Sequence, residues 1–175
     1  MSRVPVAVLD TSVFVPVWSR LILQRLAAEG RFQPVWSEWI IAETWRVLTL
    51  RWLGRNGPNS EDMLAQAANR VWRLIAVMRL LSIREFVGPA PWPGLKDTDD
   101  EPIWATAVIA KARYVVSHNI GDFPPLVDGR HVYGGTEYLT AVEFVEDVLG
   151  EDAATIYGVP LRSDALTRSQ RAPQL

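Results

Sequence analysis

Residues 4–12 read Val-Pro-Val-Ala-Val-Leu-Asp-Thr-Ser, and this stretch decides the fold. Its first part is almost entirely apolar and does not alternate with polar side chains, which is typical of a strand buried on both faces of a parallel sheet. We therefore predict a buried strand from Val4 to Leu9. Asp10 then lies at the carboxyl end of that strand, where open α/β sheets form their sites.

Helix-like and strand-like segments alternate along the rest of the chain. Ser37 is expected to cap a helix that Gly54 ends, and Thr140 with Glu143 forms a capping-box pattern for the last helix. The expected helices cover residues 20–29, 37–53, 60–78, 100–112 (starting at Asp99 or Asp100) and 140–150. The expected strands cover residues 32–35, 80–86 and 114–117, with a further one at 131–133 or at 136–139. This order predicts an α/β domain with a mainly parallel central sheet over residues 1–150, followed by a loosely packed polar tail over residues 151–175.

The composition of the 175 residues excludes several classes of protein. No cysteine is present, which rules out disulfides, cysteine-based zinc sites and a thiol nucleophile. The only histidines are His118 and His131, which argues against a multi-histidine metal site. No apolar run approaches the ~20 residues that span a bilayer, and Asp10 interrupts the stretch that a secretion signal would need. We therefore expect a cytoplasmic protein without membrane segments.

The charges are segregated along the chain, although the formal net charge is only −2. Residues 46–84 carry seven arginines against two acids, and residues 85–101 carry five acids against one lysine. Of the 18 basic residues 16 are arginine, a residue suited to phosphate contacts, although a GC-rich coding bias gives the same skew. A metal-dependent enzyme acting on phosphodiesters needs such a pattern. An ordinary surface with complementary patches also produces it.

Three acids occupy positions that are expected to face the interior. Asp10 ends the first strand, Glu43 follows the apolar face of its helix, and Asp100 precedes the apolar pair Ile103 and Trp104. Burying a carboxylate without a partner costs free energy. A divalent cation such as Mg²⁺ or Mn²⁺, bound by all three acids, would explain why they occupy interior positions. The simpler readings are that Asp10 and Asp100 only cap a turn and a helix, and that Glu43 pairs with an arginine.

A further polar segment, residues 117–123, directly follows the strand expected at residues 114–117. It reads Ser-His-Asn-Ile-Gly-Asp-Phe, so Asn119 and Asp122 could face the same cleft as the three acids. Its Asn, Gly and Asp residues are equally typical of a plain turn. Taken alone, this segment does not distinguish a site from a turn.

Four short motifs occur in one order over residues 4–149. They are Val8-Leu9-Asp10-Thr11-Ser12, then Ile41-Ala42-Glu43-Thr44-Trp45-Arg46, then Asp100 with Ile103, Trp104 and Ala107, and last Ser117 with Asn119, Asp122 and Phe123. Together they resemble the PIN domain, the fold of metal-dependent ribonucleases that includes the VapC toxins. The resemblance implies a three-layer α/β domain. The run of acids from Asp97 to Glu101 is similar to one PIN subgroup.

The resemblance also implies a mechanism and a set of site residues. One or two Mg²⁺ or Mn²⁺ ions would support hydrolysis of RNA to a 5′-phosphate and a 3′-hydroxyl, with no side chain as nucleophile. The implied metal ligands are Asp10, Glu43, Asp100 and Asp122. Asn119 stands where many members have an acid, so it is a weaker candidate than Asp122. The implied supporting residues are Thr11, Ser12, Ser117 and Asp97.

Two other classes of protein share some of these features. A phosphatase of the haloacid-dehalogenase type needs a second acid where Ser12 stands, and a catalytic lysine that only Lys96 or Lys111 could supply. The stronger alternative is a PIN-fold protein with weak or no activity that binds protein or RNA. The eight tryptophans keep it open, because Trp39, Trp45 and Trp52 cannot all share one face with Glu43. We expect some of them to be exposed or at an interface, and residues 37–78 to form a homodimer interface or a groove that binds an antitoxin protein.

Overall fold

The computed structural model describes residues 4–56, 61–81 and 100–157. The main elements follow in this order: β1 (Val6–Leu9), a 3-10 helix (Thr11–Phe14), α1 (Val17–Ala28), β2 (Gln33–Val35), α2 (Glu38–Asn56), α3 (Glu61–Leu81), α4 (Glu101–Ala110), β3 (Tyr114–Val116), a 3-10 helix (Ile120–Asp122), β4 (Leu126–Val127), β5 (Arg130–Tyr133), β6 (Thr136–Leu139), α5 (Ala141–Glu143), a π-helical turn (Phe144–Val148) and α6 (Ala153–Tyr157). Strands and helices alternate from β1 to α2, whereas α2, α3 and α4 follow one another among the described residues, and so do β4, β5 and β6.

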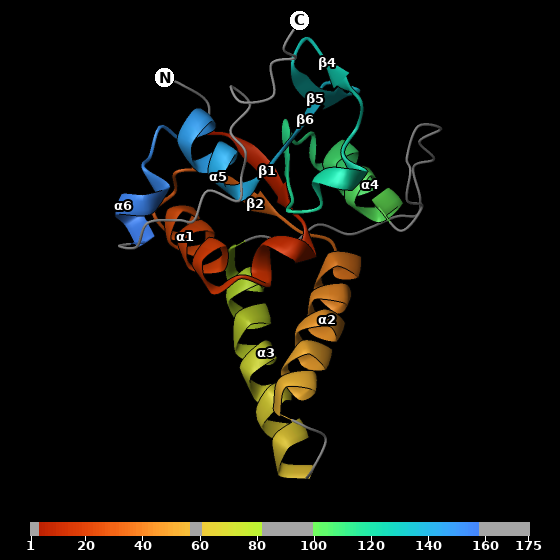
Figure 1. The fold of residues 1–175 in the computed structure, drawn as a ribbon, viewed down its shortest axis with the longest axis vertical. Coiled ribbons are helices and arrows are strands. Elements are labelled where there is room, and N and C mark those ends of the chain that lie inside the picture. The colour runs from red at the N-terminus through yellow and green to blue at the C-terminus, as the bar shows by residue number, and fades with distance from the viewer. Residues whose placement is uncertain (1–3, 57–60, 82–99, 158–175) are drawn as a thin grey trace, which may run out of the picture.

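The strands form one six-stranded sheet in the order β2-β1-β3-β6-β5-β4 (Figure 1). β1 pairs in parallel with β2 and β3, and β3 pairs in parallel with β6, whereas β5 pairs antiparallel with β4 and β6. The predicted mainly parallel α/β architecture is therefore confirmed. The chain leaves β1 toward β2 and leaves β3 toward β6, on the other side of the sheet. The carboxyl ends of β1 and β3 thus flank a topological switch point, where open α/β sheets bind ligands.

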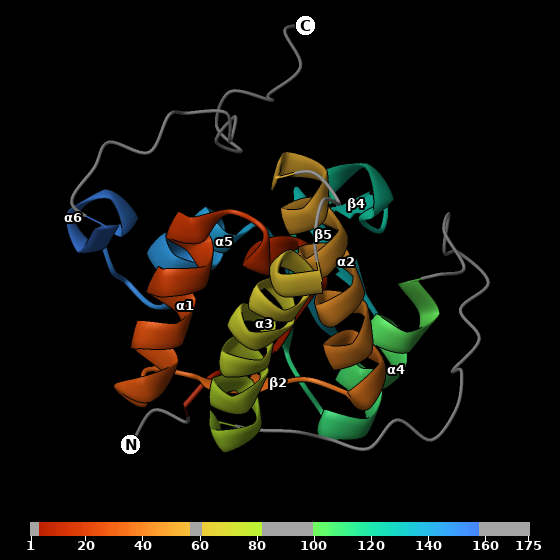
Figure 2. The same ribbon diagram turned by 90° about the horizontal axis from the view of Figure 1, so that it is seen from below.

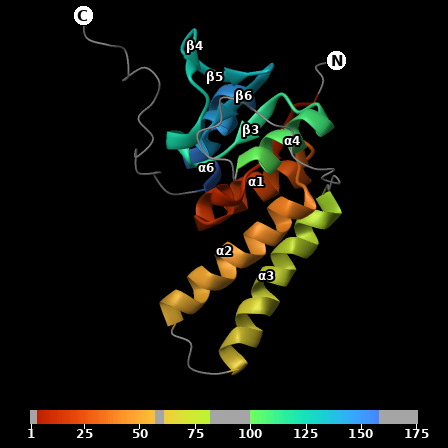
Figure 3. The same ribbon diagram turned by 90° about the vertical axis from the view of Figure 1, so that its right-hand side faces the viewer.

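Helices lie on both sides of the sheet and give the domain three layers. Figure 2 shows α1 on one side and α4 on the other, with α5 and α6 beside α1. Helices α2 and α3 form an antiparallel hairpin that extends away from the sheet (Figure 3). The near end of α2 packs against the 3-10 helix that follows β1. This hairpin therefore borders the switch point of the sheet.

The core is built from the two faces of the parallel strands and the helices that cover them. Val8 and Leu9 are almost completely buried, as the continuous apolar run predicts. Ser37 begins α2 as expected, because its hydroxyl accepts a hydrogen bond from the Ile40 amide at 3.3 Å. The capping box is also confirmed, with Thr140 and Glu143 satisfying each other's backbone amides at the start of α5.

Two helices continue beyond their predicted ends. α2 runs through Gly54 to Asn56, because Gly54 keeps a negative φ and does not form the left-handed cap that ends many helices. α3 runs to Leu81, so the strand predicted over 80–86 is wrong at its first two residues. Val71, Ile75 and Met78 are buried at helical spacing. This period favours a continued helix over the strand that the composition of the following residues suggests. Residues 82–86 lie outside the described part of the chain.

Two further segments differ from the sequence-based expectation. We predicted one strand at either 131–133 or 136–139, and the structure contains both, as the antiparallel pair β5 and β6. The first residues of the predicted tail form α6, whose Ala153 is completely buried beside α1. A small apolar residue in a polar segment was too weak a signal to predict that contact. Residues 158–175 lie outside the described part of the chain.

The turn between β5 and β6 contains a position where only glycine fits without a clash. Gly134 has φ of 54°, and a Cβ atom there would lie 2.7 Å from Cη2 of the Trp104 side chain. Gly135 has φ of 83° but no atom within 4 Å of such a Cβ. Gly134→Ala should therefore add a clash of about 1–3 kcal/mol to the backbone strain that Gly135→Ala also causes. Chemical denaturation of both variants measures the difference, and equal losses would contradict the close packing of Trp104.

Candidate active site

Asp10 lies at the junction of β1 and β3. Its amide donates to the Val116 carbonyl at 3.0 Å, which continues the parallel pairing of the two strands. Its side chain is almost completely buried, and Oδ2 accepts hydrogen bonds from the Ser12 hydroxyl at 2.6 Å and the Ser117 hydroxyl at 2.7 Å. Within the described residues, no lysine or arginine pairs with this carboxylate. Asp10 is thus an ordered buried anion held by neutral donors.

Ser12 and Ser117 join the ends of the two strands. The Ser12 hydroxyl accepts from the His118 amide at 2.8 Å and lies 3.1 Å from the Ser117 hydroxyl. The Ser117 hydroxyl accepts from the Asn119 amide at 3.0 Å. These contacts fix the turn after β3 against the turn after β1. Both serines therefore hold one oxygen of the Asp10 carboxylate in place.

Thr11 connects this junction to α2. Its hydroxyl lies 3.2 Å from Oε2 of Glu43 and 3.2 Å from the Thr44 hydroxyl. Glu43 is on the inner side of α2, with a quarter of its side chain exposed, and its Oε1 lies 3.6 Å from Nη2 of Arg46. This ion pair is long and its arginine is mostly exposed, so it contributes little. Glu43 thus pairs with an arginine, as the simpler reading expects, and it also contacts Thr11 beside Asp10.

Asp100 precedes α4 and faces the same region. It is the residue before the first turn of that helix, but its side chain makes no capping hydrogen bond to the helix. Asp10 likewise makes no side-chain capping bond to the 3-10 helix after it. Capping, the simpler reading of both acids, is therefore wrong. Ile103, Trp104 and Ala107 behind Asp100 are buried, as its helical phase predicts.

A cavity of about 520 Å³ brings most of the predicted site residues together. Its lining includes Asp10, Glu43, Asp100 and Asn119, together with Thr11, Ser12, Val15, Pro16, Val47, Arg51 and His118. Asp122 lies in a small adjoining cavity that Asp100, Asn119 and Ser117 also line. Three predicted acids thus share one cavity, and the fourth lies beside it. Asp97 falls outside the described part of the chain.

Burial and nearby acids perturb two aromatic groups around the site. Burial lowers the pKa of His118, and the negative charge of Asp10 opposes this shift only in part. His118 is therefore neutral at neutral pH, and its ring packs against Trp18 with centroids 5.5 Å apart. Burial raises the pKa of Tyr138, and the charges of Asp100 and Asp10 raise it further. The acids therefore create a negative potential that reaches the sheet behind them.

The donor set fits a hard divalent cation held by few protein ligands. Carboxylate oxygens suit Mg²⁺ and Mn²⁺, and Mg²⁺ usually keeps several waters while using one or two carboxylates plus substrate phosphates. As they are placed here, no three Asp, Glu or His side chains of the described residues cluster closely enough to hold an ion together. The observation that fits the ion is the buried Asp10 carboxylate, which no lysine or arginine of the described residues contacts and which opens into a cavity shared with two other acids.

Sequence reasoning missed two side chains of the cavity, Arg51 and His118. Arg51 lies two turns after Glu43 and one after Val47, so the i, i+4, i+8 ridge of α2 is the signal that could have found it. His118 is a neighbour of predicted residues and belongs to the same motif, but nothing in its spacing showed that it packs inward. These residues give the cavity a positive and a neutral wall beside its acids.

The comparison with family models agrees with this geometry. Residues 6–121 match the family model described as a PIN domain. The match covers more than half of the chain and includes every acid of the main cavity, so the chain belongs to the PIN-domain family, whose fold is of the nuclease type. The search of curated proteins finds no match to this sequence. Among the described residues, no helix is both long and apolar enough to cross a membrane.

Proposed function

We propose that the protein is a metal-dependent endoribonuclease that hydrolyses RNA phosphodiesters. The observation that carries this proposal is the buried Asp10 carboxylate, which has no cationic partner among the described residues and shares a cavity with Glu43 and Asp100. Membership of the PIN-domain family supports a nuclease rather than another phosphate-handling enzyme. The missing cysteine agrees with a reaction that needs no protein nucleophile.

The residues divide into ligands and groups that orient them. Asp10, Glu43 and Asp100 would hold Mg²⁺ or Mn²⁺, with Asp122 and Asn119 at the edge of the cavity. When bound, such an ion activates water and stabilises charge on a phosphate. Ser12 and Ser117 keep one oxygen of Asp10 engaged and thereby fix the direction of the other. Thr11 performs the same task for Glu43.

The hydroxyl of Ser117 offers a test of this orienting role. Ser117→Ala removes one of the two hydrogen bonds to Oδ2 of Asp10 without removing a ligand. Loss of an orienting partner of this kind typically lowers metal affinity about 10- to 100-fold. Calorimetry with Mn²⁺ measures the change. Ser19→Ala is a suitable control, because Ser19 is equally buried but bonds only to the Val13 and Pro16 carbonyls. Equal affinity of both variants for Mn²⁺ would exclude the role of Ser117.

The proposal as a whole is tested by metal binding before RNA cleavage, because an inactive assay could reflect only the wrong RNA. Wild type should bind Mn²⁺ in calorimetry, and Asp10→Asn and Asp100→Asn should each abolish binding while the circular dichroism spectrum is unchanged. Cleavage of unstructured RNA should then depend on Mg²⁺ or Mn²⁺. Absence of binding at millimolar Mn²⁺ would overturn the mechanism.

That negative result would favour the second candidate function, a PIN-fold module that binds protein or RNA without cleaving it. The observation in its favour is the exposure of two large aromatic side chains on the α2–α3 hairpin, Trp45 at 39% and Trp72 at 56%. Exposed tryptophan is enriched at interfaces. The prediction that some tryptophans lie at the surface is thus confirmed, whereas Trp36 is completely buried.

The finer biological role that we propose is the toxin of a toxin–antitoxin pair, acting as a cytoplasmic homodimer with a small cognate antitoxin protein. The resemblance of its motifs to VapC toxins and the exposed tryptophans of the hairpin support this role. Induced expression of wild type should arrest growth of a bacterial host, and Asp10→Asn should not. Arrest by both proteins at equal level would contradict a role that depends on cleavage.

A further inference from the structure

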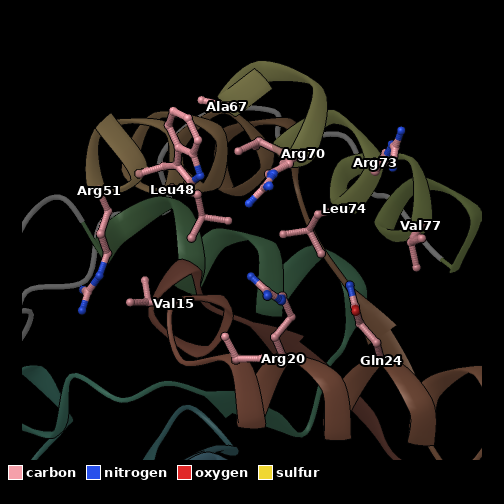
Figure 4. A pocket seen from close by; sticks show the side chains of 13 residues that line it. Val15, Arg20, Gln24, Leu48, Arg51, Ala67, Arg70, Arg73, Leu74 and Val77 are labelled. Carbon is pink, nitrogen blue, oxygen red and sulfur yellow. The ribbon is translucent and has the colours of Figure 1, made fainter. Parts of the chain in front are cut away.

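A second cavity, of about 570 Å³, lies between α1, α2 and α3 (Figure 4). Its apolar surface comes mainly from Val15, Leu48, Val71 and Leu74. Four arginines also line it, namely Arg20 of α1, Arg51 of α2, and Arg70 and Arg73 of α3. We call this cavity the arginine groove. Its combination of an apolar floor with several guanidinium groups is unlike the acidic cavity beside it.

Acids of the described residues do not balance the charges of the arginines in the groove. Within the described residues, none of the four forms an ion pair with a carboxylate. Arg20 donates only a long bond of 3.4 Å to the Phe14 carbonyl, and Arg70 lies over the Trp52 ring at 5.9 Å from its centroid. Figure 4 shows Arg20 and Arg70 directed toward the middle of the groove from opposite walls, whereas Arg73 points away from it.

The groove adjoins the acidic cavity. Val15 and Arg51 line both, so the two cavities meet at these side chains. A ligand that occupies the acidic cavity and extends past Arg51 enters the groove between Arg20 and Arg70. The arginines therefore place positive charge along one path that leads away from the acids. A polyanion held at the acids by a metal ion would need positive charge along that path.

We propose that the arginine groove binds single-stranded RNA adjacent to the scissile bond, an inference that rests on the proposed ribonuclease function. Phosphates would contact Arg20, Arg51 and Arg70, since guanidinium groups suit phosphate geometry. Trp52 supplies an aromatic ring near the arginines, and single-strand sites combine such rings with positive grooves. A paired RNA hides its bases in the stack, so only an unpaired strand uses the ring and the apolar floor.

Salt-dependent RNA binding tests this proposal independently of cleavage. The probe is a fluorescein-labelled 12-nucleotide oligouridylate, measured by anisotropy in EDTA over a series of KCl concentrations. The variant Arg20→Gln/Arg70→Gln should bind at least about tenfold more weakly at low salt. Its plot of log affinity against log salt should be shallower by about 0.7 per arginine removed. Arg25→Gln is the matched control, because Arg25 lies on the outer surface of α1 and pairs with Glu29.

A second measurement separates the groove from the acidic cavity. With Mn²⁺, the double variant should slow cleavage of the 12-nucleotide RNA more than it slows cleavage of a uridine trinucleotide. If wild type cleaves neither RNA and the salt slope still changes, the ribonuclease function fails and the groove stands as an RNA-binding surface. A double variant with the salt slope of Arg25→Gln would overturn the groove. The proposal would also be overturned if the double variant bound RNA like wild type but lost affinity for a helical peptide rich in Glu and Leu. That result would identify a protein-docking surface.

Discussion

Asp10→Asn should reduce RNA cleavage at least about a thousandfold while the protein remains folded. The carboxylate is the most buried of the three acids in the main cavity, and an amide in its place is a far weaker ligand for a divalent cation. Loss of about 4 kcal/mol of transition-state stabilisation corresponds to this factor. Initial rates on unstructured RNA with Mn²⁺ measure it, and higher Mn²⁺ should restore only part of the activity, because the amide binds the ion more weakly.

The same substitution should leave the stability unchanged or raise it. The Asn oxygen can still accept the hydroxyl hydrogen bonds from Ser12 and Ser117, and one buried negative charge is removed. Asp147→Asn is the matched control, since it makes the same chemical change at an exposed residue remote from the cavity. A lower melting temperature for Asp10→Asn than for Asp147→Asn would show that the carboxylate supports the fold, which would contradict its assignment to catalysis.

Phe14→Ala should destabilise the protein by about 3–5 kcal/mol, the cost of truncating a large buried aromatic residue. Phe14 is completely buried, and its ring centroid lies 6.1 Å from that of Trp36. For a chain of this size the melting temperature should fall by roughly 6–20 °C. Because Phe14 ends the 3-10 helix that carries Thr11 and Ser12, Mn²⁺ affinity should fall as well.

The control for Phe14 is another apolar truncation that creates no cavity. Leu21 lies on α1 with half of its side chain exposed, so Leu21→Ala should change stability by no more than about 0.5 kcal/mol. Urea denaturation compares the two variants at one temperature. Similar losses for both would mean that the packing of Phe14 against Trp36 contributes little to the fold.

The sequence alone was sufficient for the parallel core and for the placement of three acids. The apolar run before Asp10 is typical of a buried strand, so Asp10 could be placed at a strand end. The helical phase of Glu43 and Asp100 indicates that both face the interior, so they could be placed before any contact was known. Helix ends were less predictable. Gly54 is compatible with both an end and a continuation, and only packing between α2 and α3 decides between them.

The parts of the site that escaped prediction depend on contacts between distant segments. The Thr11 bond to Glu43 spans 32 residues, and no local pattern encodes it. The sequence showed that arginines gather between residues 46 and 84, but not that Arg70 faces Arg20 of another helix across one groove. It also gave no means of separating Asp122 from the three other acids, because the difference lies in which of two adjoining cavities each side chain lines.

The hydrogen bond from Ser117 to Asp10 joins residues 107 positions apart, and this has a consequence for synthesis on the ribosome. Early segments of a chain emerge first and begin to fold while later ones are still being made. The nascent chain therefore carries Asp10 and Glu43 for most of its elongation without β3 and without Ser117, which orients Asp10. We expect a chain stalled before residue 114 to neither bind Mn²⁺ tightly nor cut RNA, so that the protein becomes a nuclease only once β3 has emerged and paired with β1.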